Sequence, residues 1–120
     1  MLYEELTRLV IGAAIEVHKV LGPGFLESVY ESALAREMTE RGIRFRKQDR
    51  LEVKYKGTSI GTFRTDILVE DKIVIEIKAV QRFAAAHTAQ ALNYLAATGI
   101  RLALLLNFGA PVLGIKRVIH

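Results

Sequence analysis

Residues 66–79 read DILVEDKIVIEIKA, and this stretch decides the fold because it predicts two buried strands joined by a charged turn. The charged tripeptide at residues 70–72 stands between two segments of isoleucine, leucine and valine, which favour strands. In the second segment, residues 73–79, alternate side chains point to opposite faces, so Glu76 and Lys78 lie on the face opposite the isoleucines. The stretch therefore predicts a hairpin with one apolar face and one face that carries ionisable groups.

The length of the turn decides whether the ionisable side chains of the hairpin meet. A three-residue loop closed by Val69 and Ile73 makes these two residues opposite partners in an antiparallel pair. Counting outward along both strands then places Asp66 opposite Glu76, and Lys78 projects from the same face two residues farther on. A two-residue loop would instead put the two carboxylates on opposite faces, so the register tests the prediction.

Two helices are predicted before the hairpin. Residues 3–21 carry apolar side chains at helical spacing and end at Gly-Pro-Gly, and a second amphipathic segment starts near Leu26 and reaches a natural C-terminal cap at Gly42. Farther on, residues 51–55 alternate apolar and charged side chains, which predicts a strand, and a Gly-Thr turn separates it from a strand at 59–69. Together with the second arm of the hairpin, these strands are expected to form a three-strand meander.

The chain after the hairpin predicts one more helix and two more strands. Residues 84–98 are rich in alanine and lack proline and glycine, so they favour a helix that Gly99 closes. The nearly continuous apolar run at 101–107 is typical of a central strand buried on both faces, and residues 112–119 predict an edge strand. The predicted order of elements is ααβββαββ, which defines an α/β protein.

Composition places the chain among ordinary globular proteins. The 120 residues are 51% hydrophobic and 25% charged, a length and balance that predict a single domain spanning residues 1–120. The absence of cysteine excludes disulfides, zinc-thiolate sites and thiol nucleophiles, and it fits a reducing cytoplasm. The N-terminus lacks a basic leader segment and no apolar run approaches the roughly 20 residues of a membrane span, so we expect a cytoplasmic protein without a membrane partner.

The net charge is +4, but acidic and basic residues are distributed unevenly along the chain. Residues 1–40 contain seven acidic and three basic residues, whereas residues 41–120 contain six acidic and fourteen basic residues. A polyanion would be held by the second part. Five basic residues there could contact a nucleic-acid backbone by neutralising phosphates: Lys47, Arg50, Arg64, Arg82 and Lys116.

The three ionisable side chains of the hairpin form a chemically specific set. Asp66 and Glu76 repel each other at short range unless a positive charge lies between them, and a hard divalent cation with oxygen ligands, such as Mg²⁺, is the usual solution. Lys78 beside such a cation could stabilise or deprotonate an attacking water and offset charge on a phosphoryl group. The set therefore indicates hydrolysis of a phosphodiester; the alternative is a salt-bridged group on a solvated sheet face.

The order of the elements, with Asp66 on the second predicted strand and Glu76-x-Lys78 on the third, resembles the PD-(D/E)xK nuclease superfamily. More narrowly, the segment GFLESVY at residues 24–30 resembles the motif that names the GxxExxY proteins, a small bacterial and archaeal family placed in that superfamily. The resemblance implies a restriction-endonuclease-like core with a central mixed sheet flanked by helices. Thr65 departs from the pattern, which has proline before the aspartate.

The resemblance also implies roles for individual residues. Asp66 and Glu76 resemble the metal ligands of the superfamily. The Ile77 carbonyl resembles a third ligand, and Lys78 resembles the catalytic lysine. Glu27 resembles the helical glutamate that related nucleases add to the metal site; alternatively it is an exposed residue near a helix N-terminus, where the helix dipole favours an acid. The implied cofactor is one or two Mg²⁺ or Mn²⁺ ions.

The predicted helix after the hairpin contains Gln90-Ala-Leu-Asn-Tyr94, which is similar to the QxxxY element of RecB-like and lambda-exonuclease-like nucleases. His87, Gln90 and Tyr94 are spaced so that they share one helix face. From that face they could orient Lys78 or hold a phosphate of the substrate. The alternative is the ordinary polar side of an amphipathic helix.

Three functions are compatible with these observations. The leading hypothesis is a metal-dependent nuclease that cleaves DNA, with RNA as the less favoured substrate. The second is a noncatalytic nucleic-acid-binding module that keeps the fold. The third is an interaction subunit in which the first helix or the edge strand forms a homo-oligomer or binds a protein partner. Retention of every ionisable group of the site favours the nuclease.

Overall fold

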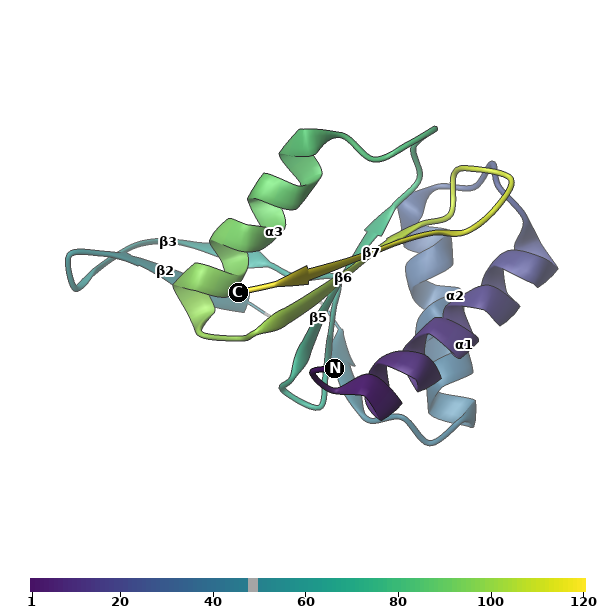
Figure 1. Cartoon of the computed structure of the whole chain (residues 1–120), viewed down its shortest axis with the longest axis horizontal. Coiled ribbons are helices and arrows are strands. Elements are labelled where there is room, and N and C mark those ends of the chain that lie inside the picture. The colour runs from purple at the N-terminus through teal and green to yellow at the C-terminus, as the bar shows by residue number, and fades with distance from the viewer. Residues whose placement is uncertain (48–49) are drawn as a thin grey trace.

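A five-stranded mixed sheet separates two N-terminal helices on one face from a third helix on the other (Figure 1). The computed structural model describes residues 1–47 and 50–120. The elements in chain order are α1 (Glu4–Leu21), α2 (Glu27–Glu40), β1 (Phe45–Lys47), β2 (Arg50–Tyr55), β3 (Thr58–Arg64), β4 (Ile67–Val69), β5 (Ile73–Lys78), α3 (Ala85–Thr98), β6 (Leu102–Asn107) and β7 (Gly114–Ile119). The sheet order is β1-β4-β5-β6-β7, with β5 and β6 parallel and the other neighbours antiparallel. The predicted α/β class, with a mixed sheet flanked by helices, is confirmed.

Helix α2 shows how a local signal ends a helix where the sequence predicts. Gly42 has a φ of 74°, in the left-handed region that favours glycine. Its N–H donates to the carbonyl of Thr39 at 3.1 Å, and the N–H of Ile43 donates to the carbonyl of Met38 at 2.9 Å. This pair of hydrogen bonds is the Schellman arrangement, and it turns Ile43 back into the core beside the helix.

No helix in the described part of the chain combines the length and the apolar character needed to cross a membrane.

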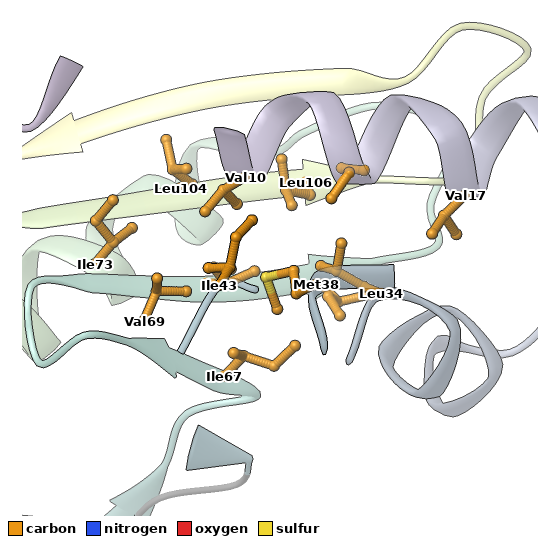
Figure 2. Close-up of a cluster of buried hydrophobic side chains, with 14 of the residues drawn as sticks. Val10, Val17, Leu34, Met38, Ile43, Ile67, Val69, Ile73, Leu104 and Leu106 are labelled. Atoms are coloured by element: carbon orange, nitrogen blue, oxygen red, sulfur yellow. The ribbon is translucent and has the colours of Figure 1, made fainter. Parts of the chain in front are cut away.

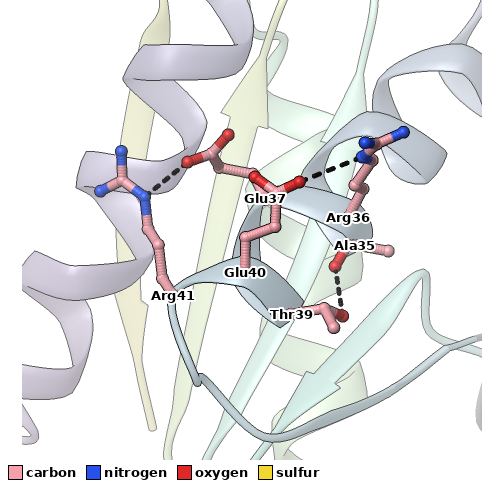
Figure 3. A network of polar contacts seen from close by, with 6 residues as sticks. All are labelled: Ala35, Arg36, Glu37, Thr39, Glu40 and Arg41. Carbon is pink, nitrogen blue, oxygen red and sulfur yellow. Dashed lines mark hydrogen bonds and ion pairs between the residues drawn. The ribbon is translucent and has the colours of Figure 1, made fainter.

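The C-terminal half of α2 carries two ion pairs at the surface (Figure 3). Arg36 pairs with Glu40 at 3.2 Å, and Arg41 pairs with Glu37 at 2.7 Å, each across about one helical turn. Because all four side chains are at least partly exposed, each pair contributes only about 0.3–0.5 kcal/mol to the free energy of unfolding.

Buried side chains form two layers, one on each face of the sheet. Figure 2 shows the larger layer, where α1 and α2 pack on the sheet through Val10, Val17, Leu34, Met38, Ile67, Val69, Ile73, Leu104 and Leu106. The smaller layer lies under α3 and contains Leu68, Val74, Ala91, Leu95, Ala103, Leu105 and Val118. Strand β6 is buried along its whole length and β7 lies at an edge, as predicted. The alternation of β5 sends its isoleucines into the larger layer and turns Glu76 and Lys78 toward the α3 side.

The chain before β5 differs from the predicted meander. The strand expected at 59–69 is two strands, because β3 ends at Arg64 and β4 begins at Ile67. Strands β2 and β3 form a separate two-stranded sheet, while β1, which the sequence did not predict, pairs with β4. Strand β4 is fully buried, whereas six of the seven residues of β3 are exposed, so the two halves cannot belong to one layer. The fold class is correct, and the meander is wrong at this point.

Candidate active site

The site lies where the pairing between β4 and β5 stops. The three-residue turn has the predicted register, and the ladder ends with Ile67 opposite Ile75. Continued by one position, this register places Asp66 opposite Glu76. The predicted register of the β4–β5 hairpin, which places these two carboxylates on the same face, is therefore confirmed.

A side-chain hydrogen bond of Asp66 takes the place of the next rung of the ladder. Its Oδ2 accepts the N–H of Ile77 at 2.6 Å. In this register the carbonyl of Thr65 would otherwise accept that N–H. The chain leaves the sheet at Thr65, and β4 does not cover the edge of β5 beyond Ile75.

The Ile77 carbonyl points to the same edge of β5 as the Ile77 N–H, because both groups of one strand residue face the same neighbour. The opposite edge is marked by Lys78, whose carbonyl accepts the N–H of Phe108 at 2.9 Å on the β6 side. The Ile77 carbonyl is thus directed toward the side of β5 where Asp66 lies. An oxygen in this position can join the two carboxylates as a ligand.

Glu76 is the more deeply buried carboxyl group, with 8% of its surface exposed. Burial, and then the charge of Asp66, raise its pKa from 4.5 to about 8, although Lys78 acts in the opposite direction. Its Oε1 is buried and has no hydrogen-bond partner among the described residues. The pKa of Asp66 is also raised, chiefly by burial, while the hydrogen bond from the Ile77 N–H lowers it. A cation between these two groups would favour their charged forms.

Helix α2 brings two more carboxylates toward this pair. Glu27 is the exposed first residue of α2, and its charge raises the pKa of both Asp66 and Glu76. Glu31 lies one turn farther along and is only 6% exposed. Its charge raises the pKa of Asp66 more than the charge of Glu27 does. Sequence reasoning missed Glu31, although its spacing of four residues from Glu27 on a helix was a usable signal.

Tyr30, the last residue of the GxxExxY-like segment, anchors the loop that leads into α2. Its hydroxyl donates to the carbonyl of Gly22 at 2.6 Å and accepts the N–H of Phe25 at 3.1 Å. The buried ring stacks on Phe108, with 4.7 Å between the centroids and 12° between the planes. The tyrosine therefore determines where α2 begins, and hence where Glu27 lies.

A buried asparagine at the end of β6 holds the segment that follows Lys78. Asn107 Oδ1 accepts the N–H groups of Val80 and Gly109, both at 3.0 Å, and its Nδ2 donates to the Val80 carbonyl at 2.8 Å. A Cβ at Gly109 would lie 2.5 Å from backbone atoms of Ala79 and Val80, so only glycine permits this approach. These contacts, which sequence reasoning missed, set the direction of the chain after Lys78.

Helix α3 places two of its three predicted site residues near the acidic pair. Burial, followed by the charge of Glu76, raises the pKa of Tyr94, and a hydrogen bond with Gln90 lowers it. His87 has a local role instead, because its Nδ1 accepts the N–H of Ala84 at 3.1 Å and so caps the start of α3.

The five basic residues singled out from the sequence are exposed but unevenly placed. Arg50 and Arg64 are cross-strand partners at the inner end of the β2–β3 hairpin, and Lys47 ends β1 beside β4. Arg82 follows the end of β5 by four residues, whereas Lys116 lies on β7, on the far side of β6. All but Lys116 are therefore on segments that adjoin the acidic pair.

The donors of the site fit a hard divalent cation that keeps water ligands. Asp66 and Glu76 offer two carboxylates, and Ile77 offers a main-chain carbonyl on the same edge. Within residues 1–47 and 50–120, no three His, Cys, Asp or Glu side chains are grouped as a metal site. Mg²⁺ typically binds through one or two carboxylates and retains several waters.

Asp66 stands at the break before the short strand β4, and Glu76-x-Lys78 lies on the neighbouring strand of the mixed sheet, which is the arrangement that the resemblance to PD-(D/E)xK nucleases implies. The sequence model of the PD-(D/E)XK nuclease superfamily matches residues 4–118 of this chain, and the chain therefore belongs to this superfamily. Nucleases of the superfamily generally use divalent metals.

Two solved structures share the fold. The crystal structure of SSO0001 is similar with a TM-score of 0.59 at 16% identity, over 78% of this chain and 49% of that one. An alkaline exonuclease, LHK-Exo from Laribacter hongkongensis, is similar with a TM-score of 0.53 at 16% identity, over 89% of this chain and 76% of that one. The chain thus spans about half the length of SSO0001. No protein of curated function matches the sequence significantly.

Proposed function

We propose that this chain is a metal-dependent nuclease that hydrolyses phosphodiester bonds of DNA, with RNA as the less favoured substrate. The observation that carries the proposal is the buried carboxyl group of Glu76, whose Oε1 has no hydrogen-bond partner among the described residues and whose pKa rises to about 8 beside Asp66. Burying a carboxyl group where it resists ionisation opposes folding, and such groups concentrate at functional sites. Membership of a nuclease superfamily supports the same conclusion.

The chain's own residues have separable tasks in this proposal. Asp66, Glu76 and the Ile77 carbonyl would hold Mg²⁺ or Mn²⁺, and such an ion, when bound, activates water and offsets charge on the phosphoryl group. The Ile77 N–H keeps the Asp66 carboxylate oriented. Lys78 offers an ammonium that can orient or deprotonate the attacking water. Glu27 would add a carboxylate from the start of α2.

The substrate backbone would lie along α3 and the inner end of β3. Gln90 and Tyr94 are hydrogen-bonded to each other near the acidic pair, so they can orient a phosphate oxygen. Arg64, at the end of β3, can neutralise a phosphate. His87 keeps Nδ1 bonded in the cap of α3, so Nε2 is its atom for a phosphate contact.

We also propose that the chain is one of the GxxExxY proteins within the superfamily. The roles of Glu27 and Tyr30 at the start of α2 support the resemblance of residues 24–30 to the GxxExxY proteins. The cysteine-free composition supports a cytoplasmic protein. One five-stranded sheet with a buried layer on each face supports a single domain over residues 1–120.

Cleavage assays with purified protein test the proposal. Single- and double-stranded DNA and RNA are incubated with Mg²⁺, Mn²⁺ or EDTA, and we expect DNA cleavage with either ion and none in EDTA. Asp66→Ala and Lys78→Ala should each lower the rate by about 10³-fold or more, because a bound ion and the groups around it supply several kcal/mol.

Asp71→Asn and Lys72→Ala are matched controls, because both residues are exposed in the turn of the same hairpin and asparagine tolerates the φ of 58° at Asp71. They should cleave at the wild-type rate. Cleavage that persists unchanged in Asp66→Ala or Lys78→Ala would show a contaminating nuclease and overturn the proposal. Salt-sensitive binding without metal-dependent cleavage would instead indicate a noncatalytic nucleic-acid-binding module.

A further inference from the structure

The β2–β3 hairpin projects from the rest of the molecule (Figure 1). It forms its own two-stranded sheet, and six of the seven residues of β3 are exposed. Its outer part includes Tyr55 and Ile60, which are 59% and 63% exposed. A ribbon that the fold covers so little is available to another molecule.

Basic residues outnumber acidic ones in this hairpin. Its four basic residues are Arg50, Lys54, Lys56 and Arg64, and its single acidic residue is Glu52. Lys54 makes a long surface pair with Glu52, at 3.6 Å, and such exposed pairs contribute little to stability. The hairpin therefore complements the charge of a polyphosphate.

The tip of the hairpin places a lysine where the turn disfavours one. Lys56 and Gly57 connect Tyr55 to its cross-strand partner Thr58, and Lys56 has a φ of 49°. Two-residue turns with positive φ at both positions favour Asn-Gly, and another side chain there costs roughly 1 kcal/mol. The turn thus presents a positive charge at the end of the hairpin.

The inner end of the hairpin adjoins the candidate active site. Phe63 of β3 stacks on Tyr94 of α3, with 3.7 Å between the ring centroids and 11° between the planes. The charge of Glu76 acts on that same Tyr94. From the end of β3 the chain continues through Thr65 directly to Asp66. A polymer bound at the acidic pair would thus pass close to the ribbon.

We propose that the β2–β3 hairpin is a docking arm for duplex nucleic acid, with the lysines near its tip on phosphates of the duplex. The inference rests on the proposed nuclease function and adds the substrate class. A two-stranded ribbon fits the major groove of a duplex. Strand β3 has seven residues. At about 3.3 Å per residue the arm reaches roughly 20 Å, or about six base pairs, from its inner end.

The aromatic residues of the hairpin favour a duplex over a single strand. Single strands are held on exposed aromatic faces, on which their bases stack. The faces of Phe63 and Tyr94 that meet are occupied by each other, and the ammonium of Lys56 lies 5.5 Å from the Tyr55 ring centroid. One face of each of these rings is thus occupied, and with four basic residues against one acidic residue, charge is the main attraction that the arm offers a partner.

The test is the salt dependence of duplex binding by a variant that carries Lys54→Gln and Lys56→Asn. Affinity for a DNA duplex several turns long is measured by fluorescence anisotropy in EDTA over a range of salt concentrations. Loss of two phosphate contacts should reduce the slope of log affinity against log salt by about 2 and weaken binding about tenfold at low salt. Because asparagine suits a positive φ, the melting temperature should be unchanged or higher, which separates lost charge from lost fold.

The matched control carries Lys19→Gln and Lys72→Gln, which remove the same charge from exposed positions on α1 and in the β4–β5 turn. It should keep the wild-type slope. An unchanged slope in the hairpin variant, or an equal loss in the control, would overturn the docking arm. A wild-type dimer in sedimentation that the hairpin variant loses would assign the arm to a second copy of the chain instead. Metal-dependent cleavage with an unchanged slope would refute the arm alone, and arm-dependent binding without cleavage would refute the nuclease alone.

Discussion

The two ends of α2 carry glutamates in opposite electrostatic settings. Near the C-terminal end, Glu37 and Glu40 each pair with an arginine about one turn away, at 2.7 and 3.2 Å (Figure 3). Toward the N-terminal end, Glu27 and Glu31 raise the pKa of another carboxyl group, Asp66. The first arrangement stabilises the helix slightly, whereas the second places like charges together and opposes folding. Glutamates of one helix therefore differ in their electrostatic effect according to the groups that the fold places opposite them.

The largest expected effect is a loss of stability of the metal-free protein as the pH rises. The pKa of Glu76 is about 8 in the folded chain against an ordinary value of 4.5. Between these values the folded state holds a proton that the unfolded state has released. The free energy of unfolding should therefore fall by up to about 1.4 kcal/mol per pH unit across this window, and the raised pKa of Asp66 acts in the same direction. Urea denaturation in EDTA at several pH values measures the slope.

Two comparisons sharpen this measurement. Glu76→Gln should flatten the dependence on pH, because the titrating group is gone. Mg²⁺ should restore stability at the upper end of the window, since a bound cation favours the ionised carboxylates. A metal-free wild-type protein that becomes more stable between pH 4.5 and about 8 would contradict the raised pKa of Glu76.

A smaller effect is expected where the two ends of α2 are compared directly. Glu31→Gln removes a like charge that acts on Asp66, so in the metal-free protein it should reduce the part of the pH-dependent loss of stability that comes from the raised pKa of Asp66. It should also weaken Mg²⁺ binding by about 10–100-fold, the range typical of groups that support metal ligands. Calorimetric titration and thermal melting measure the two effects. Glu37→Gln, on the same helix, should leave the affinity for Mg²⁺ unchanged; equal losses in both variants would remove the distinction between the two ends.

Tyr30→Phe should have an intermediate effect on stability and a distinct effect on the cleavage rate. The change keeps the ring on Phe108 but removes the hydroxyl contacts to Gly22 and Phe25, which should lower the free energy of unfolding by about 1–2 kcal/mol. If Tyr30 acts by positioning Glu27, then Glu27→Gln should slow cleavage less in the Tyr30→Phe background than in the wild type. Fully additive losses in the cleavage rate would show that the two residues act independently.

The smallest effect is expected at the C-terminal end of α2. Arg36→Ala breaks an exposed pair with Glu40 and should cost no more than about 0.5 kcal/mol in urea denaturation. The cleavage rate and the affinity for Mg²⁺ should not change. A loss of activity in this variant would give the C-terminal end of α2 a role beyond helix stability.

Local patterns were sufficient for the hairpin that carries the acidic pair. The isoleucines of β5 alternate with Glu76 and Lys78, so the buried face could be read directly. The three-residue turn set the register that brings Asp66 opposite Glu76, because turn length and strand parity are local geometry.

Contacts between distant residues were beyond any local pattern. The strand predicted at 59–69 is interrupted after Arg64, and Asp66, just beyond the interruption, accepts the N–H of Ile77, eleven residues away. In the sequence Asn107 is the last residue of an apolar run, but its side chain forms hydrogen bonds with the backbone of Val80, 27 residues away. Neither partner can be recognised from the residues beside it.

The sequence by itself determined the helices, most strands, the buried face of β5 and the register of the β4–β5 hairpin, since periodicity and turn length act over a few residues. Only the tertiary structure decided that the β2–β3 hairpin stands apart and that α2 turns Glu27 and Glu31 toward Asp66. Spacing on a helix says which glutamates share a face. Which groups that face contacts depends on how the whole chain packs, and this decides whether a glutamate joins an ion pair or lies beside another carboxyl group.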